Sequence, residues 1–282
     1  MERQHITEAY MSSLKRERRA ADNTVLAYRN DLQQFETYLN GVVGDGAGWG
    51  QVTRDHVIQF IAQLNARYST STVARKIAAL KSLFAWLRAN RHIGADPILD
   101  LRAPPIARRA PHTLTPDEVV RLMEAPVGEN PMRARRDRAL LELLYSSGMR
   151  VSEVIGLRLA DLDLERAEVR CAGRGSRDRV VPLSPRAIVA LRDYLAGARA
   201  ESAAGGPTDY VFLNPAGSSL TRQAVWLMTR QHARAAGLHG EITPHTLRHS
   251  RAEHLMAEGE NPRRVQEIFG HANIATTQSY RQ

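Results

Sequence analysis

The sequence predicts a mainly α-helical protein of two domains, with one small β-sheet in the second domain. Apolar residues recur at helical spacing through most of the chain, and only the segment around 168–183 has the pattern of paired strands. A segment rich in proline and arginine separates the two halves. Because the chain has 282 residues, each half is long enough to bury a core of its own.

The first domain is expected over residues 1–96, as a unit of four helices. Two of these helices follow from apolar stripes, over 25–39 and 73–87, in which the apolar residues are three or four positions apart. Ser69 or Ser71 is the candidate N-cap of the second stripe. We interpret both stripes as faces that pack into the core.

Two shorter helices, near 6–19 and 53–67, complete this four-helix unit. Between them lies a glycine-rich stretch, 41–50, which we expect to be a loop.

The segment 97–111 is predicted to be a basic connector between the domains. Its prolines exclude a helix interior, because proline lacks the N–H that the helix needs. Its arginines suit either a path along a phosphate backbone or a solvated spacer. The residues concerned are Pro97, Arg102, Pro104, Pro105, Arg108, Arg109 and Pro111.

The second domain is expected over 112–282. A capping box over 115–118 opens it, with proline at the first helical position. Two strands, over 168–171 and 179–183, flank a turn that contains Arg174. A further strand is expected over Tyr210 to Leu213. Helices are expected over 133–147, 185–197, 221–236, 244–258 and 262–269, with a final short helix that carries Tyr280.

Composition indicates a soluble protein with a polyanionic partner. Hydrophobic residues make up 43% and charged residues 24%, as in globular proteins, and no run approaches the ~18 apolar residues of a membrane span. The N-terminus does not resemble a signal peptide, and the single cysteine suits a reducing cytoplasm. The net charge of +9 favours nucleic acid as a partner, although basic proteins without one exist.

A set of charged and hydroxyl side chains in the second domain matches the demands of phosphodiester cleavage by a protein nucleophile. The set is Arg150, His245, Arg248, His271 and Tyr280. Fixed cationic donors are needed around the charged oxygens of the transition state, and arginine suits that task. A tyrosine nucleophile is neutral at pH 7 and needs a base or electrostatic help. The histidine and arginine at 245 and 248 share one face of a helix.

The motifs around these residues resemble those of the tyrosine recombinase (phage integrase) family, Xer type, over nearly the full chain. They are Asn23-Thr-Val-Leu-Ala-Tyr-Arg-Asn-Asp-Leu, Leu144-Tyr-Ser-Ser-Gly-Met-Arg-Val-Ser-Glu, His245-Thr-Leu-Arg-His-Ser and Phe269-Gly-His-Ala-Asn-Ile-Ala-Thr-Thr-Gln-Ser-Tyr. The resemblance implies a two-domain, C-shaped DNA clamp. An N-terminal core-binding, SAM-like domain of four helices would precede an α+β catalytic domain.

The resemblance also implies a role for each residue. Tyr280 would attack one DNA strand, forming a 3′-phosphotyrosyl bond and freeing a 5′-hydroxyl. Arg150 and Arg248 would clamp the phosphate, His245 would assist proton transfer from the tyrosine, and His271 would hydrogen-bond the phosphate. No metal or other cofactor is needed in this chemistry.

The partner implied by the family is double-stranded DNA at a specific site, with four protomers in the synaptic complex. A second Xer-type recombinase and a DNA translocase are further candidate partners, and no membrane is involved. The expected role is resolution of chromosome or plasmid dimers in the cytoplasm. The alternatives are an integrase of a mobile element, or a slow or inactive sequence-specific DNA-binding relative.

Arg174 departs from the family pattern, in which a lysine of the hairpin protonates the leaving hydroxyl. Arginine donates hydrogen bonds but releases its proton poorly, so the rate loss could reach ~10²–10⁴-fold. The basic residues of this chain number 39, and only Lys15, Lys76 and Lys81 are lysines. A coding bias towards arginine explains the exchange, so we expect a slower enzyme that is still active.

A metal hydrolase is the last alternative, because His245, His249 and His254 could gather on one helix. The spacing argues against it, since the His-Glu-x-x-His pattern of zinc hydrolases does not occur in the sequence.

Overall fold

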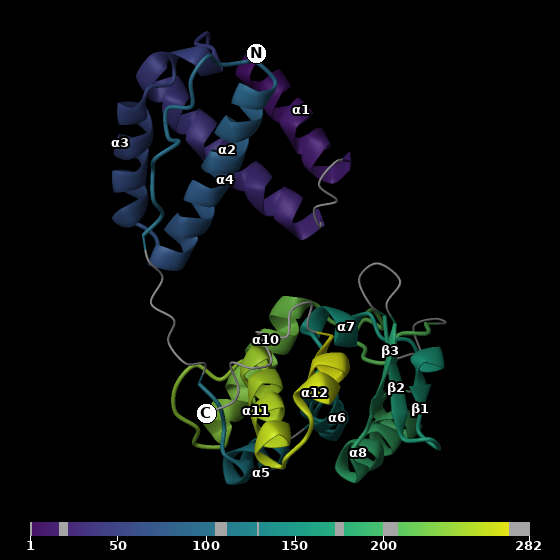
Figure 1. Ribbon diagram of the computed structural model, residues 1–282. Coiled ribbons are helices and arrows are strands. Elements are labelled where there is room, and N and C mark those ends of the chain that lie inside the picture. Colours follow the sequence, from purple (N-terminus) through teal and green to yellow (C-terminus); the bar gives the residue numbers. More distant parts are fainter. Residues whose placement is uncertain are drawn as a thin grey trace. The chain divides into compact units, whose positions relative to one another are not determined.

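The computed structural model describes residues 2–16, 22–104, 112–128, 130–172, 178–199 and 208–270. Their contacts divide the chain into two compact units, Met1–Arg109 and Ala110–Gln282. Both units are mainly helical, and the three strands of the one sheet lie in the second (Figure 1). Among the described helices, none is long and apolar enough to span a bilayer.

The first unit contains the four predicted helices. These helices are α1 (Glu2–Arg16), α2 (Asp22–Val43), α3 (Arg54–Asn65) and α4 (Thr70–Ala89), with a short 3₁₀ helix η1 (Trp49–Gln51) between α2 and α3. Ser69 is the N-cap of α4, in an extended backbone conformation. The second apolar stripe is buried as predicted, along one side of that helix.

Aromatic rings fill the centre of this unit. The Phe35 ring lies 4.9 Å from Phe60, 6.3 Å from Trp49 and 6.4 Å from Phe84, measured between centroids. All four side chains are buried, so α2, α3, α4 and η1 share one core. Rings at these separations attract one another beyond the free energy of burial alone.

The loop predicted over 41–50 is wrong for its first residues. Helix α2 continues through Gly41 to Val43, and the chain leaves the helix at Gly44, whose φ is +87°. Glycine weakens a helix interior by only about 1 kcal/mol, so Gly41 does not stop the helix. The left-handed backbone at Gly44 is the conformation that does end it.

The start of the segment predicted as a connector packs against the first unit. Ile98 is fully buried in the aromatic core, and its N–H donates to Asp96 at 2.9 Å. Lys81 Nζ donates to the carbonyl of Leu101 at 2.9 Å. Residues 105–111 lie outside the described residues, so the basic connector stays a prediction.

The second unit combines eight helical segments and a sheet in the residues that the structure describes. The helices are α5 (Pro116–Glu124), α6 (Pro131–Ser147), α7 (Val151–Ile155), η2 (Leu159–Asp161), α8 (Pro185–Ala196), α10 (Arg222–Ala235), α11 (Pro244–Ala257) and α12 (Pro262–Phe269). The strands are β1 (Leu162–Asp163), β2 (Glu168–Cys171) and β3 (Arg179–Pro182). The predicted capping box is confirmed: Thr115 Oγ1 accepts from the Glu118 N–H, and Glu118 accepts from the Thr115 N–H.

The sheet is antiparallel, in the order β1-β2-β3. Cys171 pairs with Arg179, so the predicted hairpin is confirmed up to its turn, and residues 173–177 of that turn lie outside the described residues. Strand β1 was not predicted, because two residues are too few to show alternation. The strand predicted over 210–213 is wrong: Tyr210 and Leu213 form only isolated bridges.

Helix α6 lies at the centre of this unit, where it packs against α8 and α11. Helix α12 contacts both α11 and β3, and Figure 1 shows α12 between these two elements. The end of α12, the start of β3 and the start of α7 therefore come close together, although they are far apart in sequence.

Candidate active site

Arg150 is held where α6 ends and α7 begins. Helix α6 stops at Gly148 in the left-handed conformation (φ +58°), and a Cβ there would lie 2.5 Å from the Phe269 ring. Only glycine allows both this turn and this close approach. Arg150 follows as the N-cap residue of α7, with 46% of its side chain exposed. Its guanidinium is therefore accessible to a ligand.

Glu153 lies one turn further along and fixes that guanidinium. It accepts from the Arg150 N–H at 2.7 Å and from Arg150 Nη1 at 3.0 Å. It also accepts from both terminal nitrogens of Arg179, at 3.0 and 2.9 Å. The Glu153 side chain is only 10% exposed and that of Arg179 12%. Two arginines therefore share one carboxylate at the edge of the core.

Burial by itself would raise the pKa of Glu153, but the hydrogen bonds from Arg179 and from the Arg150 backbone lower it below its ordinary value. Burial likewise opposes the charge on Arg179, and Glu153 nevertheless raises the pKa of that arginine. Both groups are therefore charged at pH 7, and the cluster carries a net positive charge beside α7.

Arg248 reaches the same place from α11. Thr243 caps this helix through the Thr246 N–H, and Pro244 occupies its first turn, as the sequence predicts. Arg248 is 4% exposed and donates to the carbonyls of Gly148 and Phe269. Its guanidinium lies 4.9 Å from the Phe269 ring centroid. The structure thus brings Arg150 and Arg248 together around the end of α12.

His245 lies one turn before Arg248 on α11 and is exposed. Its ring meets that of His249 edge to face, with centroids 4.4 Å apart. Desolvation, then the charges of Arg248 and Arg150, lower the pKa of His245. Desolvation and the neighbouring His245 lower the pKa of His249 to about 4. A neutral His245 at pH 7 can accept a proton.

Three of the predicted catalytic residues lie outside the described residues: Arg174, His271 and Tyr280. Glu153 and Arg179 were not predicted. The sequence did offer a signal for Glu153, since an acidic residue three positions after an N-cap closes a capping box, and this one does. Nothing in the spacing of Arg179 points to Glu153, because their contact depends on the packing of β3 against α7.

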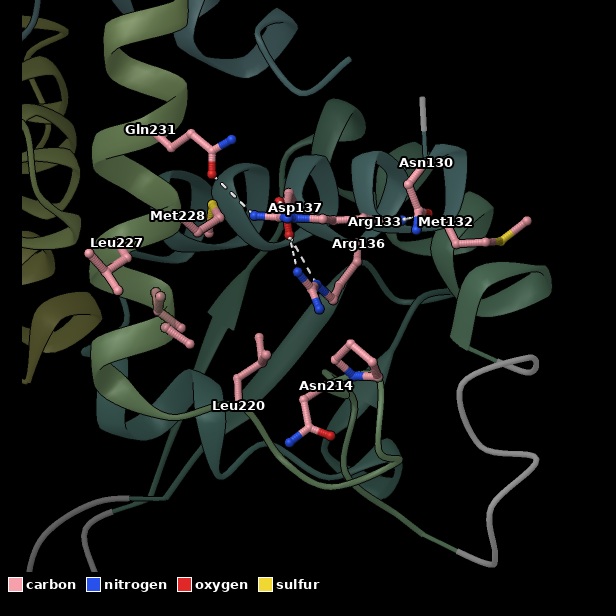
Figure 2. A pocket seen from close by; sticks show the side chains of 13 residues that line it. Asn130, Met132, Arg133, Arg136, Asp137, Asn214, Leu220, Leu227, Met228 and Gln231 are labelled. Carbon is pink, nitrogen blue, oxygen red and sulfur yellow. Dashed lines mark hydrogen bonds and ion pairs between the residues drawn. The ribbon is translucent and has the colours of Figure 1, made fainter. Parts of the chain in front are cut away.

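A second cluster of charges lines a cavity of about 540 Å³ between α6, α10 and the loop 214–220. Figure 2 shows Asp137 beside Arg136 there, with Arg133 reaching Gln231. The Asp137 side chain is 1% exposed, and it accepts from Arg136 at 2.7 Å and pairs with His232 Nε2 at 3.0 Å. None of the predicted site residues lines this cavity.

In the described part of the chain, no three His, Cys, Asp or Glu side chains are placed to hold a metal ion. Both ring nitrogens of His254 are already used: Nδ1 is 2.7 Å from the Tyr145 hydroxyl, and Nε2 is 2.9 Å from the Leu114 carbonyl. The histidine cluster that a metal hydrolase needs is therefore not present on α11.

Comparison with known proteins agrees with this geometry. Residues 112–282 match the phage integrase family, and residues 7–91 match the phage integrase N-terminal SAM-like domain. Tyrosine recombinase XerC of Roseiflexus sp. (strain RS-1) is 43% identical over 97% of this chain and 87% of its own. Tyrosine recombinase XerD of Halalkalibacterium halodurans is 37% identical over 97% of this chain and 91% of its own.

Solved structures give the same fold. The crystal structure of XerA recombinase is 26% identical, covers 99% of this chain and 93% of its own, and has a TM-score of 0.55. XerH site-specific recombinase, bound to a palindromic difH substrate, is 23% identical and has a TM-score of 0.76 over 93% of this chain and 77% of its own. The chain therefore belongs to the phage integrase family. Within that family it is an Xer-type tyrosine recombinase, an enzyme of site-specific recombination.

Proposed function

We propose that this recombinase cuts and rejoins double-stranded DNA through a 3′-phosphotyrosyl bond to Tyr280. One observation carries the proposal: Arg150 and Arg248, from α7 and α11, both donate to carbonyls at the end of α12, directly before His271 and the segment with Tyr280. Two fixed guanidiniums thus lie at Phe269 and Gly270, directly before the segment that contains the predicted nucleophile Tyr280. Such donors stabilise the charge that develops on a phosphoryl group.

The individual roles follow from chemistry. Arg150 and Arg248 hold the non-bridging oxygens of the scissile phosphate, and His271 adds a hydrogen bond. His245 takes the proton of Tyr280 as the phenol attacks, since its lowered pKa keeps it neutral. The 5′-hydroxyl that leaves needs a proton donor, and Arg174 is the candidate at the position where the family has lysine.

We assign residues 1–96 to DNA core binding, 97–111 to a basic linker and 112–282 to catalysis. A specific recombination site is the substrate, as for XerH, whose structures contain difH DNA. Four protomers form the synaptic complex in the cytoplasm, with a second Xer-type recombinase and a DNA translocase as candidate partners. Dimer resolution of chromosomes or plasmids is the role that we assign to this recombination, and the XerC and XerD relatives support site-specific recombination itself.

A nicked suicide substrate tests the proposal. The purified protein is incubated with duplex DNA that carries its own recombination site, found by mapping the DNA that it protects, with a nick beside the scissile phosphate. The short 5′-hydroxyl product then diffuses away and the covalent adduct accumulates on a denaturing gel. Wild type is expected to form the adduct, and Tyr280→Phe none. Tyr210→Phe serves as the control, because Tyr210 lies outside the proposed site. An adduct that persists in Tyr280→Phe contradicts the proposal.

The same assay tests Arg174. Arg174→Lys restores an acid that releases its proton more readily, so adduct formation is expected to accelerate, within the ~10²–10⁴-fold range of general acid catalysis. Arg166→Lys, at an exposed turn, is the control for the exchange itself. If Arg174→Lys gives no gain, Arg174 is not the donor to the leaving oxygen.

A further inference from the structure

Three arginines from three elements hold the last carbonyls of α12. Arg179 Nε donates to the carbonyl of Ile268 at 2.7 Å, Arg248 Nη2 donates to that of Phe269, and Arg150 Nη2 donates to that of Gly270 at 2.9 Å. We call this set the α12 clamp. They are the carbonyls of the last two residues of α12 and of its C-cap, Gly270, where a helix presents backbone carbonyls to partners outside it.

The clamp is electrostatically favourable as well. The C-terminal end of a helix carries a partial negative charge, which cations stabilise. Helix α12 ends at Gly270 in the left-handed conformation (φ +58°), and a Cβ there would lie 3.3 Å from Arg179 Nη1. Glycine therefore allows the guanidinium of Arg179 to lie against the backbone at this point.

Arg179 differs from Arg150 in that a phosphate cannot reach it in the same way. Its side chain is 12% exposed, and all three of its guanidinium nitrogens are engaged by Glu153 or Ile268. Glu153 in turn holds Arg150. Arg179 thus connects the start of β3, the carboxylate that orients Arg150, and the helix end that precedes His271.

We propose that Arg179 is a positioning residue for strand cleavage: it fixes Arg150 through Glu153 and fixes the entry to the Tyr280 segment through Ile268. The proposal rests on the proposed function, since it assigns Arg150 and Tyr280 to the reaction. Arg179 itself contacts neither substrate nor nucleophile in this account. Its place as the first residue of β3, five positions after Arg174, also ties the hairpin to the same cluster.

Arg179→Gln tests this proposal, with Arg170→Gln as the matched control. Arg170 lies on the neighbouring strand, is exposed, and pairs only with Asp161 at 3.0 Å among the described residues. Arg179→Gln is expected to slow single-turnover adduct formation by ~10²-fold, the cost of misplacing a reacting group by about 1 Å. DNA affinity is expected to stay within about threefold of wild type, because phosphate contacts elsewhere dominate binding. Arg179→Lys keeps a positive charge beside Glu153, so its rate of adduct formation should lie between those of wild type and Arg179→Gln.

A double-variant cycle separates positioning from a general structural role. If Arg179 acts through Glu153, the variant with both Arg179→Gln and Glu153→Gln is about as slow as the slower single variant. Independent effects would instead multiply, to ~10⁴-fold. A multiplicative result, or an Arg179→Gln rate equal to wild type, overturns the proposal. A rate loss that a parallel loss of DNA binding or folded protein fully accounts for overturns it as well.

Amide hydrogen exchange keeps this test independent of the proposed function. The amides over 262–270 are expected to exchange faster in Arg179→Gln than in wild type or Arg170→Gln, since one helix-end contact is lost. If wild type forms no adduct, the proposed function fails. Amide hydrogen exchange still shows in that case whether Arg179 holds the end of α12. Unchanged exchange over 262–270 means that Arg179 does not hold α12, and the proposal fails.

Discussion

Two clusters of charged residues have similar contacts but different surroundings. One is Glu153 with Arg150 and Arg179 (the Glu153 cluster), and the other is Asp137 with Arg136 and His232 (the Asp137 cluster). Each centres on a carboxylate with at most 10% of its side chain exposed, which accepts from an arginine that also donates to a distant backbone carbonyl. In both clusters burial would raise the pKa of the carboxylate, and hydrogen bonds from the cationic partners lower it instead. The local chemistry of the two carboxylates is therefore the same.

The second cation makes the difference. Beside Asp137 it is His232, which is itself buried and joins α6 to α10. The exposed Arg133 lies further from the same carboxylate, at 3.6 Å. Beside Glu153 the second cation is Arg150, whose side chain is 46% exposed. A carboxylate whose hydrogen-bond partners are largely buried stabilises a fold, whereas one that accepts from an exposed arginine at 3.0 Å can hold that arginine ready for a phosphate.

The largest effect is expected from Asp137→Asn. The substitution leaves Arg136 and His232 without their charged partner in the interior, and breaking a buried pair costs about 3–5 kcal/mol. Urea unfolding should show this loss in the free energy of unfolding. The rate of adduct formation per folded molecule should stay near that of wild type.

Asp193→Asn is the control for this change, because its ion pair with Arg135 is on the surface. Its cost should be below about 1 kcal/mol. Equal losses in the two variants would mean that the Asp137 cluster does not stabilise the unit.

Glu153→Gln should have the opposite effect to Asp137→Asn: the reaction slows, whereas the loss of stability is the smaller change. The amide keeps the shape of the side chain but removes the charge that orients Arg150 and Arg179, so adduct formation should slow by ~10²-fold. The measurement is the single-turnover rate at saturating DNA. Glu165→Gln, which affects an exposed pair with Arg192, is the control and should keep the wild-type rate. A wild-type rate in Glu153→Gln would mean that the charge of Glu153 does not orient Arg150 for the reaction.

The last effect is absent at pH 7 and appears only on acidification: a pH dependence of stability due to His249, beside the proposed active site. The folded protein lowers the pKa of His249 to about 4, below the ordinary 6.5. Between these values the unfolded chain binds more protons, so stability is lost as the pH falls from 6.5 towards 4. Asp137 and Glu153, whose pKa values are also lowered, contribute stability above the ordinary carboxyl pKa and lose it only at lower pH.

The test compares urea unfolding of wild type and His249→Gln from pH 7 to pH 4. Wild type should lose stability relative to the variant across this window, and titrating groups far from His249 cancel in the difference. His239→Gln, in an exposed position, controls for the loss of an imidazole. A constant difference between wild type and His249→Gln would show that the folded protein does not keep His249 neutral across this window.

Local patterns predicted most of this fold. The longer helices and the β2–β3 hairpin follow from periodicity and from caps such as Thr115 and Thr243, because these signals lie within one segment. The short helices α7, η1 and η2 were not predicted. The continuation of α2 through Gly41 did not follow, since packing outweighs the weak helix preference of glycine. Strand β1 exists only because β2 lies beside it.

The site was predicted in part, for the same reason. Arg150, His245 and Arg248 each belong to a recognisable local motif, and the structure brings Arg150 and Arg248 to the same helix end. Arg179 and Glu153 belong to the cluster only through the tertiary contact of β3 with α7 and α12. No spacing in the sequence encodes that contact.

The role of Glu153 in the reaction is decided most directly by comparing Glu153→Gln with Asp137→Asn in one assay: the rate of adduct formation divided by the fraction of folded, DNA-bound protein. This ratio should be near the wild-type value for Asp137→Asn and about 10² lower for Glu153→Gln. Equal ratios in the two variants would contradict this role, because the Glu153 cluster would then serve the fold alone.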